Sequence, residues 1–417
     1  MIWRRTVRRF RPYSDRVDES AAPWHQATAA LITAGEMVQP SGLGTAVNEA
    51  VRPMGVDVTI YLIDLEQRTL RALPRSGKPT PDSVSVEASI AGRAFMTIAP
   101  VLPTAGDARV WMPIVDGTER LGVADIRLPE TMSTHDPQIL DGLRVFMMLI
   151  GHLLVSKLAY GDGLRRLRRS QHMSVGGELL WRMLPPLTFA TTNLALAAVI
   201  EPCYRVGGDA FDYAVDHDTA RLSIFDAVGH DLNASITTTL TLAATRAARI
   251  QNLDLPAVAT AADQALTSQF DDLRYTTAVL AELDLQRGGL RYLNAGHPAT
   301  ILIRRGKAVC ALEGARRMPL GLIDSTDEVA EYSLEPGDRL LFHTDGITEA
   351  RDAEGEPFGV SRLVDLAERH ATAGLPAPEI LRRLSHAVVD HQHGVVHDDA
   401  TLMIVEWAPL AGTSVTP

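Results

Sequence analysis

The apolar positions between residues 21 and 51 recur at helical spacing, with an interruption by glycine and proline near Pro40. Short runs of apolar and β-branched residues follow, and turn residues such as Pro74, Gly77 and Asp116 separate them. These runs predict strands at 56–63, 69–73, 110–115 and 121–128, with a short helix at 89–95. A helix, strands, a short helix, more strands and a long helix, in that order, predict an α+β domain over residues 20–150.

Between residues 136 and 184 the pattern changes to that of one long helix. Five apolar residues step by three or four positions, as in a coiled-coil seam: Leu140, Leu143, Met147, Ile150 and Leu154. The register slips at Lys157, and Pro185 ends the helix. This spacing predicts a helical linker over 151–188 that joins two chains into a homodimer. The alternative is a helix packed on its own domain. In a dimer, a signal would shift the seam at Lys157, and inserting one residue there should change the basal activity.

Residues 189–410 are richer in strands than the first half of the chain. Seven strands are predicted, at 194–200, 222–225, 277–283, 290–294, 299–303, 339–343 and 401–405. Four helices are predicted, at 233–251, 257–270, 360–371 and 377–391, with prolines between them. The short connection at Gly288 and Gly289 indicates a hairpin, so the sheets should be mainly antiparallel, with helices on their faces.

The composition narrows the function classes. The 417 residues include 40 Lys+Arg and 51 Asp+Glu, a net charge of −11, which argues against a non-specific nucleic-acid binder. Two cysteines, Cys203 and Cys310, cannot form a disulfide framework. The basic tail over residues 1–19 is not followed by an apolar segment, so it is not a secretory signal. The most apolar stretch, 145–155, is shorter than the roughly 20 residues of a membrane span. We therefore expect a cytoplasmic protein without a membrane span.

Four separated aspartates stand where a predicted strand meets a turn: Asp209, Asp226, Asp345 and Asp398, the last followed by Asp399. Glycine beside such a strand end lets the backbone turn sharply and bring distant carboxylates together. A cluster of carboxylates does not stay ionised without a cation, and an all-oxygen ligand set suits Mg²⁺ or Mn²⁺ rather than Zn²⁺. Each aspartate alone also fits an ordinary turn or backbone cap. The set as a whole predicts a metal centre.

Four motifs carry a family resemblance: Val206-Gly-Gly-Asp-Ala-Phe-Asp212, Asp226-Ala-Val-Gly-His230, Thr344-Asp-Gly-Ile-Thr-Glu-Ala350 and Asp398-Asp-Ala-Thr401. In this order, over residues 190–408, the chain resembles the PPM family of metal-dependent protein Ser/Thr phosphatases, in its bacterial SpoIIE-like branch. The resemblance implies an α/β sandwich of two mainly antiparallel sheets flanked by helices.

The resemblance also implies roles for individual residues. Asp209 and Asp226 would bind both of two Mn²⁺ or Mg²⁺ ions, and the Ala227 carbonyl would be a further ligand. Asp345 and Asp398 would complete the shell of the first ion. Three residues would contact these ligands without binding the ions themselves: Asp212, Asp399 and Thr401. The implied reaction is direct attack of metal-bound hydroxide on a phosphoserine or phosphothreonine, without a phospho-enzyme. Cys203 lies outside all of these motifs, which agrees with that reaction.

Two positions near the motifs need separate interpretation. Asp231 stands where the family usually has glycine, and it would cap the following helix while adding negative charge near the metals. His297, in Asn294-Ala-Gly-His-Pro298, is either a general acid near the leaving group or a turn histidine bonded to the backbone. His230 carries the same two readings.

The first domain resembles a GAF domain over about residues 20–160, through the runs 60–64, 91–95 and 119–123. GAF domains often hold a small ligand in a pocket over the sheet, and the sequence does not identify such a ligand. The alternative is an empty GAF domain used for dimerisation.

Together these predictions describe a signalling phosphatase with a basic tail (1–19), a GAF-like sensor (20–150), a helical linker (151–188) and a phosphatase domain (189–410). By resemblance to the branch, its substrate would be a phosphorylated protein, such as an anti-sigma-factor antagonist. The alternative function is a non-catalytic scaffold that binds a phosphoprotein without turnover.

Overall fold

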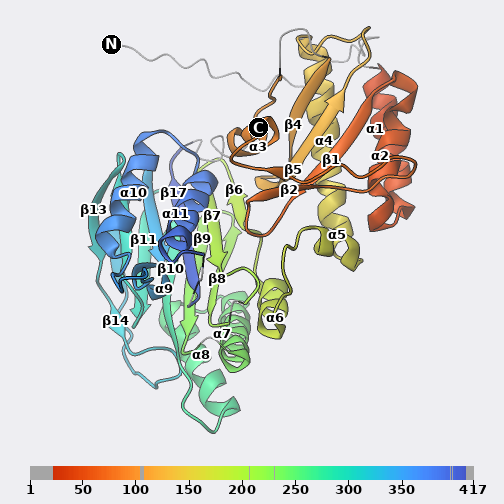
Figure 1. Ribbon diagram of the computed structural model, residues 1–417. Helices are drawn as coiled ribbons and strands as arrows, with labels where there is room; N and C mark the ends of the chain where they lie inside the picture. Colours follow the sequence, from red (N-terminus) through yellow and green to blue (C-terminus); the bar gives the residue numbers. More distant parts are fainter. Residues whose placement is uncertain are drawn as a thin grey trace, which may run out of the picture.

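The computed structural model describes residues 22–103, 108–205, 207–229, 231–394, 396 and 398–409. The predicted basic tail, together with Val206 and His230 of the predicted motifs, lies outside these described residues. The N-terminal sheet and its helices form one body, and two further sheets with their helices form a second body beside it (Figure 1).

The N-terminal body is built on a five-stranded antiparallel sheet with the strand order β3-β2-β1-β5-β4. Its strands are β1 (Asp57–Ile63), β2 (Thr69–Ala72), β3 (Val84–Ser85), β4 (Arg109–Asp116) and β5 (Glu119–Arg127). Its helices are α1 (Ala22–Met37), α2 (Leu43–Val51), α3 (Ile90–Thr97) and α4 (Pro137–Leu158), with short 3-10 turns η1 (Pro40–Gly42) and η2 (Arg52–Met54). The four predicted strands and the short helix are confirmed. The two-residue strand β3 was too short to give a pattern.

Alternation along β1 explains how this sheet is covered on both faces. Ile60 and Leu62 pack with α1, α2 and α4 on one face, whereas Tyr61 and Ile63 pack with α3 on the other. The sheet is therefore covered on two sides, and β1 is buried from Val58 to Ile63. The assignment of this body to the GAF domains stays a prediction.

The prediction of one long linker helix is wrong. Helix α4 ends at Leu158, and two shorter helices follow, α5 (Asp162–Leu167) and α6 (Val175–Met183). Gly161 between α4 and α5 is extended, with φ −170° and ψ 162°, and so breaks the helix. The predicted seam residues Leu143, Ile150 and Leu154 are fully buried in the core of the N-terminal body. Their spacing arises because α4 packs on its own domain. These residues therefore do not form a seam between two chains.

Helix α4 also bears on the membrane prediction, because it is longer than the apolar stretch that the sequence suggested. Among the described helices, α4 alone is long and apolar enough to cross a membrane by length and composition, with a mean hydropathy of 1.7. One such helix is weak evidence, since the core helix of a globular domain has the same composition. Phe146 and Ile150 of α4 pack into the N-terminal core.

The C-terminal body contains two six-stranded sheets, and every strand pairing but one is antiparallel. The first sheet has the order β14-β11-β10-β9-β8, with β15 beside β11, and the second has the order β13-β12-β16-β17-β7-β6. The first sheet comprises β8 (Asp209–Asp216), β9 (Thr219–Ala227), β10 (Thr276–Asp284), β11 (Gly289–Ala295), β14 (Arg316–Arg317) and β15 (Ala330–Ser333). The second comprises β6 (Thr188–Ala190), β7 (Leu194–Glu201), β12 (Thr300–Arg304), β13 (Lys307–Leu312), β16 (Asp338–His343) and β17 (Ala400–Trp407).

The two sheets pack face to face and helices cover their outer faces (Figure 1). Helices α7 (Leu232–Ile250) and α8 (Leu255–Gln269) pack on the first sheet, and α10 (Val360–Thr372) and α11 (Ala377–His391) cover the second. A single helical turn, α9 (Asp345–Thr348), follows β16. The predicted α+β fold with a C-terminal sandwich is confirmed. The strand β8 was missed, because its sequence mixes aspartates with apolar residues.

Candidate functional site

Two of the predicted aspartates face each other across neighbouring strands. Asp209 is the first residue of β8 and lies directly opposite Asp226 of β9. Asp209 shares its face of the sheet with Phe211, and Asp226 shares its face with Ile224. Phe211 and Ile224 are fully buried in the core between the two sheets. Both carboxylates therefore point into the space between the sheets, at one end of the sandwich.

The other predicted aspartates approach from the second sheet. Asp345 begins α9, directly after β16, and Asp398 precedes the neighbouring strand β17. Thr344 joins the two sheets at this point. Its hydroxyl donates to the Asp209 carboxylate at 2.7 Å and accepts from the backbone N–H of Thr401 at 2.9 Å. The strand ends of two different sheets thus bring together residues that lie almost 190 positions apart in the chain.

Asp399 organises the backbone beside this site. Its carboxylate accepts hydrogen bonds from the backbone N–H groups of Gly207 at 2.7 Å and Gly208 at 2.5 Å. The N–H of Asp209 lies at 3.4 Å from the same oxygen. Asp399 is buried, and so its carboxylate fixes the turn that presents Asp209. This is the supporting position that the family resemblance implied for Asp399.

Glycine is required at two close approaches in the site. A Cβ atom on Gly208 would lie 2.5 Å from the carbonyl oxygen of Ala227 and 2.7 Å from that of Gly229. A Cβ on Gly346 would lie 1.8 Å from the carbonyl oxygen of Asp399. The turn carrying Asp209 and the turn carrying Asp345 can therefore reach the neighbouring backbone only without a side chain.

The carboxylates of the site repel one another. Burial, followed by the charges of Asp345, Asp398 and Asp399, raises the pKa of Asp226 to about 8. Burial, followed by the charges of Asp226 and Asp399, raises the pKa of Asp209 well above its usual range. Several carboxylates gathered in one partly buried site are stable only when protons or a cation neutralise their charge.

The donor set suits a hard cation that keeps water ligands. Within the described residues, no three or more His, Cys, Asp or Glu side chains are grouped closely enough to hold an ion by themselves. Mg²⁺ usually keeps several waters and takes only one or two carboxylates from the protein. The facing pair Asp209 and Asp226 supplies that number, and the surrounding donors are oxygens. The residues present therefore fit a divalent, oxygen-preferring ion.

One supporting role implied by the resemblance is wrong. Asp212 lies an odd number of residues from Asp209 on β8, so its side chain points to the opposite face of the sheet. There its carboxylate forms ion pairs with Arg246 at 2.6 Å and Arg249 at 2.7 Å, both on α7. Asp212 fastens a helix to the sheet and does not support the metal ligands.

The interpretation of Asp231 as a helix cap is confirmed. Its carboxylate accepts a hydrogen bond from the backbone N–H of Ala234 at 3.0 Å, at the first turn of α7. Asp231 is exposed to solvent.

His297 is buried in its turn rather than presented to solvent. Its backbone N–H donates to the Asn294 side chain at 2.7 Å, and its Nδ1 lies 2.7 Å from the Thr277 hydroxyl. Burial lowers the pKa of His297 to about 3. The ring is therefore neutral at physiological pH, and a neutral imidazole is too weak an acid to serve as a general acid. His297 is therefore a turn histidine, as the second interpretation predicted, because its backbone is bonded within the turn. Its ring contacts the Thr277 hydroxyl rather than the backbone.

Two threonines of the site were not found from the sequence. Thr344 contacts Asp209, and Thr277 lies directly opposite Asp226 in the β9–β10 pairing. Thr344 stands inside a predicted motif, which was its only signal. Thr277 could be placed only from the strand register, which the sequence does not give.

Cys203 does not supply a nucleophile to this site. Both are free thiols, and burial raises the pKa of Cys203 well above its usual value. The thiol therefore stays protonated, and only a thiolate attacks efficiently. This agrees with the expectation that catalysis uses no cysteine.

Comparison with known families identifies the C-terminal body. Residues 216–408 match the family model described as Stage II sporulation protein E (SpoIIE). These residues form a SpoIIE domain of the PPM phosphatase type. The SpoIIE match contains Asp226, Asp345 and Asp398, and Asp209 lies just before it.

Named relatives each match about half of the chain. "Phosphoserine phosphatase RsbU" of Bacillus subtilis (strain 168) is 22% identical over 216 residues, covering 51% of this chain and 63% of RsbU. "Phosphoserine phosphatase RsbP" of the same organism is 25% identical over 210 residues, covering 48% of this chain and 49% of RsbP. The solved RsbU and RsbW domains of Rv1364c from Mycobacterium tuberculosis are 27% identical, covering 52% of this chain and 62% of that one, with a TM-score of 0.46. The chain thus spans less than two thirds of the length of these relatives.

Proposed function

We propose that this chain is a metal-dependent protein serine/threonine phosphatase that acts in the cytoplasm on a phosphorylated bacterial regulator, such as an anti-sigma-factor antagonist. The observation that carries the proposal is the facing pair of Asp209, which is buried, and Asp226, which is partly buried, between two sheets beside Asp399. The relatives RsbU and RsbP, both named phosphoserine phosphatases, support the reaction class. The match of residues 216–408 to the SpoIIE family model supports the assignment of this domain to the same kind of phosphatase.

In this proposal, the site holds two Mn²⁺ or Mg²⁺ ions. The proposed ligands are the carboxylates of Asp209, Asp226, Asp345 and Asp398 and the carbonyl of Ala227. Such ions, when bound, lower the pKa of a water molecule, orient it towards phosphorus and stabilise the charge that develops on the phosphoryl oxygens.

The chain's own residues position the carboxylates. Asp399 holds the amides of Gly207 and Gly208, so that Asp209 cannot turn away from Asp226. The Thr344 hydroxyl donates to Asp209 and leaves its second oxygen for other contacts. These preformed hydrogen bonds reduce the reorganisation that ligand binding would otherwise require.

The N-terminal body is proposed as a GAF-like sensor over residues 20–150, joined through residues 151–188 to the phosphatase domain at 189–410. A small molecule bound to the sensor remains part of this proposal, with the ligand unspecified.

The experiment uses the full chain with Mn²⁺ and a phosphoserine peptide, and measures released phosphate. We expect turnover that depends on Mn²⁺ and falls at least about 100-fold in Asp226→Asn, because the substitution removes one of the facing carboxylates. Asp216→Asn is the matched control, since Asp216 is an exposed aspartate at the far end of the same strand β8 as Asp209. It should retain wild-type activity.

Activity that survives Asp226→Asn, or that persists in excess chelator, would refute the metal mechanism. The alternative function, a scaffold, predicts that the wild-type chain binds the phosphopeptide without releasing phosphate. A binding measurement on the same peptide separates that outcome from a simple loss of substrate recognition.

A further inference from the structure

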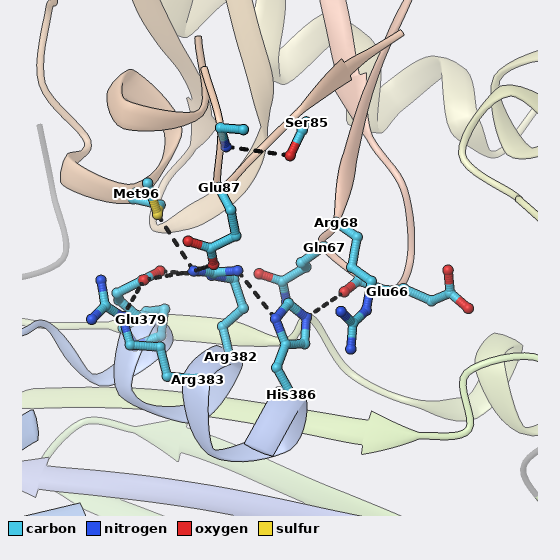
Figure 2. Close-up of polar contacts among 12 residues, drawn as sticks. Glu66, Gln67, Arg68, Ser85, Glu87, Met96, Glu379, Arg382, Arg383 and His386 are labelled. Atoms are coloured by element: carbon cyan, nitrogen blue, oxygen red, sulfur yellow. Dashed lines mark hydrogen bonds and ion pairs between the residues drawn. The ribbon is translucent and has the colours of Figure 1, made fainter. Parts of the chain in front are cut away.

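Helix α11 of the phosphatase domain begins against the N-terminal body, and buried charges meet there. Arg382 donates to Glu87 of the N-terminal body at 2.6 Å and to Glu379, one turn back on α11, at 2.9 Å (Figure 2). Arg120 of β5 donates to the same Glu379 at 3.3 Å and to the carbonyl of Pro378 at 3.2 Å. Arg383 of α11 also donates to Glu379, at 2.8 Å, so three arginines share one carboxylate at the boundary between the bodies.

The burial of these groups makes the contact specific. The side chains of Arg120, Glu379 and Arg382 are 3%, 2% and 1% exposed. A buried charge that loses its partner is left uncompensated, so sliding one body over the other is strongly disfavoured. The bodies are therefore held in one mutual position and are not merely tethered by the linker.

A second set of contacts joins the β1–β2 turn of the N-terminal body to the phosphatase domain. His386, one turn after Arg382, donates from Nε2 to the carbonyl of Glu66 in the β1–β2 turn at 2.9 Å (Figure 2). Cys203, after β7, lies 3.4 Å from the neighbouring carbonyl of Leu65. The β1–β2 turn of the N-terminal body thus contacts both α11 and the segment after β7.

Glu201 connects α11 to that segment. Ser385 of α11 donates to the Glu201 carboxyl at 3.2 Å, and the Cys203 N–H donates to the other oxygen at 3.4 Å. Glu201 ends β7 and pairs with Ala400, the residue directly after Asp399. The chain after Cys203 continues to Gly207 and Gly208, whose amides bind Asp399.

We propose that docking of the N-terminal body on α11 sets the position of the metal-site carboxylates, with Ser385 and Glu201 as positioning residues between them. The docked arrangement is the one in which Asp399 holds the Gly207 and Gly208 amides, so docking assembles the site and undocking loosens it. This deepens the proposed phosphatase function, and only its catalytic consequence rests on that function. The route passes through α11 and not through a coiled-coil seam in the linker.

The test uses the full chain and two readouts that do not need turnover. Hydrogen exchange is measured in peptides covering 201–212 and 398–407, and Mn²⁺ affinity by titration calorimetry. Arg120→Gln and Ser385→Ala should each raise exchange in both peptides and weaken Mn²⁺ binding at least about fivefold, the lower range of coupling between sites. Glu201→Gln keeps an acceptor for Ser385 and should stay within twofold of wild type.

Matched controls separate the coupling from general loosening. Glu130→Gln changes an exposed charge of the N-terminal body away from α11 and should leave both readouts unchanged. Glu87→Gln is the milder interface variant, because the Glu87 side chain is 63% exposed, and it replaces Arg120→Gln if that chain does not fold.

The proposal is overturned if the interface variants raise exchange at 63–69 and 379–386 while the site peptides and Mn²⁺ affinity match the control. It is equally overturned if removing both Arg120 and Glu87 charges leaves interface exchange unchanged. A wild-type chain that shows the coupling but never hydrolyses the phosphopeptide would instead refute the proposed function and leave this inference standing.

Discussion

Gly208 gives the most direct test of the site geometry. In Gly208→Ala, the new Cβ would lie 2.5 Å from the Ala227 carbonyl oxygen and 2.7 Å from that of Gly229. Both obstacles are backbone, so no flexible side chain can move out of the way. The substitution removes none of the carboxylates of the site. It therefore tests how their position, rather than their chemical identity, affects the activity.

The size of the effect follows from the distances. Ordinary contact begins near 3.4 Å, so the turn or the end of β9 must move by about 0.9 Å. That movement would lengthen the 2.5 Å hydrogen bond from Gly208 to Asp399 and displace Asp209 from Asp226. A misplacement of about 1 Å in an active site costs about 100-fold in rate, and overpacking costs about 1–3 kcal/mol of stability.

The assay compares kcat/KM on a phosphoserine peptide with the free energy of unfolding in urea. Gly163→Ala is the control, because a Cβ at that position in α5 would meet nothing within 4 Å. We expect Gly163→Ala to match wild type in kcat/KM and to raise the free energy of unfolding by no more than about 1 kcal/mol, because alanine favours the helix over glycine. If Gly208→Ala keeps more than a third of the wild-type kcat/KM, the close approach of the two turns does not position the site and this reasoning fails.

Three further predictions follow from the charges around the site. Asp231→Ala removes the cap of α7 and should lower the free energy of unfolding by about 1 kcal/mol, without weakening Mn²⁺ binding measured by calorimetry. Asp212→Ala leaves Arg246 and Arg249 without their buried partner and should cost about 3 kcal/mol in urea unfolding, with Mn²⁺ affinity within twofold of wild type; a large loss of affinity would restore Asp212 to the metal site. Because the pKa of Asp226 is raised from 3.8 to about 8 in the folded chain, its contribution to stability is full below pH 4 and is lost as pH rises through 8. The urea midpoint of the metal-free chain should therefore fall between about pH 4 and about pH 8 and level off above that, and Asp226→Asn should flatten that fall.

Much of the fold could be predicted from local patterns. The strands β7, β10 and β17 and the helices α7 and α11 appear within two residues of their predicted positions. Each has a strong apolar period bounded by turn residues. Elements without that contrast could not be predicted. One is β3, which has two residues, and another is β13, in which exposed residues alternate with partly buried ones without a regular polar and apolar pattern.

The spacing in α4 shows where such reasoning fails. Leu143, Ile150 and Leu154 lie on one apolar stripe whether the stripe faces a second chain or its own sheet. The period of 3.6 residues per turn defines which face is buried, and it carries no information about what covers that face. The structure shows that the partner is the sheet of the same chain.

The site divides in the same way. The sequence by itself determined which side chains are proposed to carry the chemistry, since strand ends beside glycine marked Asp209, Asp226, Asp345 and Asp398 without any coordinates. Only the tertiary structure decided that Asp399 binds two backbone amides, that Asp212 pairs with arginines on the opposite face, and that α11 meets the N-terminal body through buried charges. The physical reason is that a side chain's direction and partners depend on strand register and sheet packing. These arise from contacts between residues far apart in the chain.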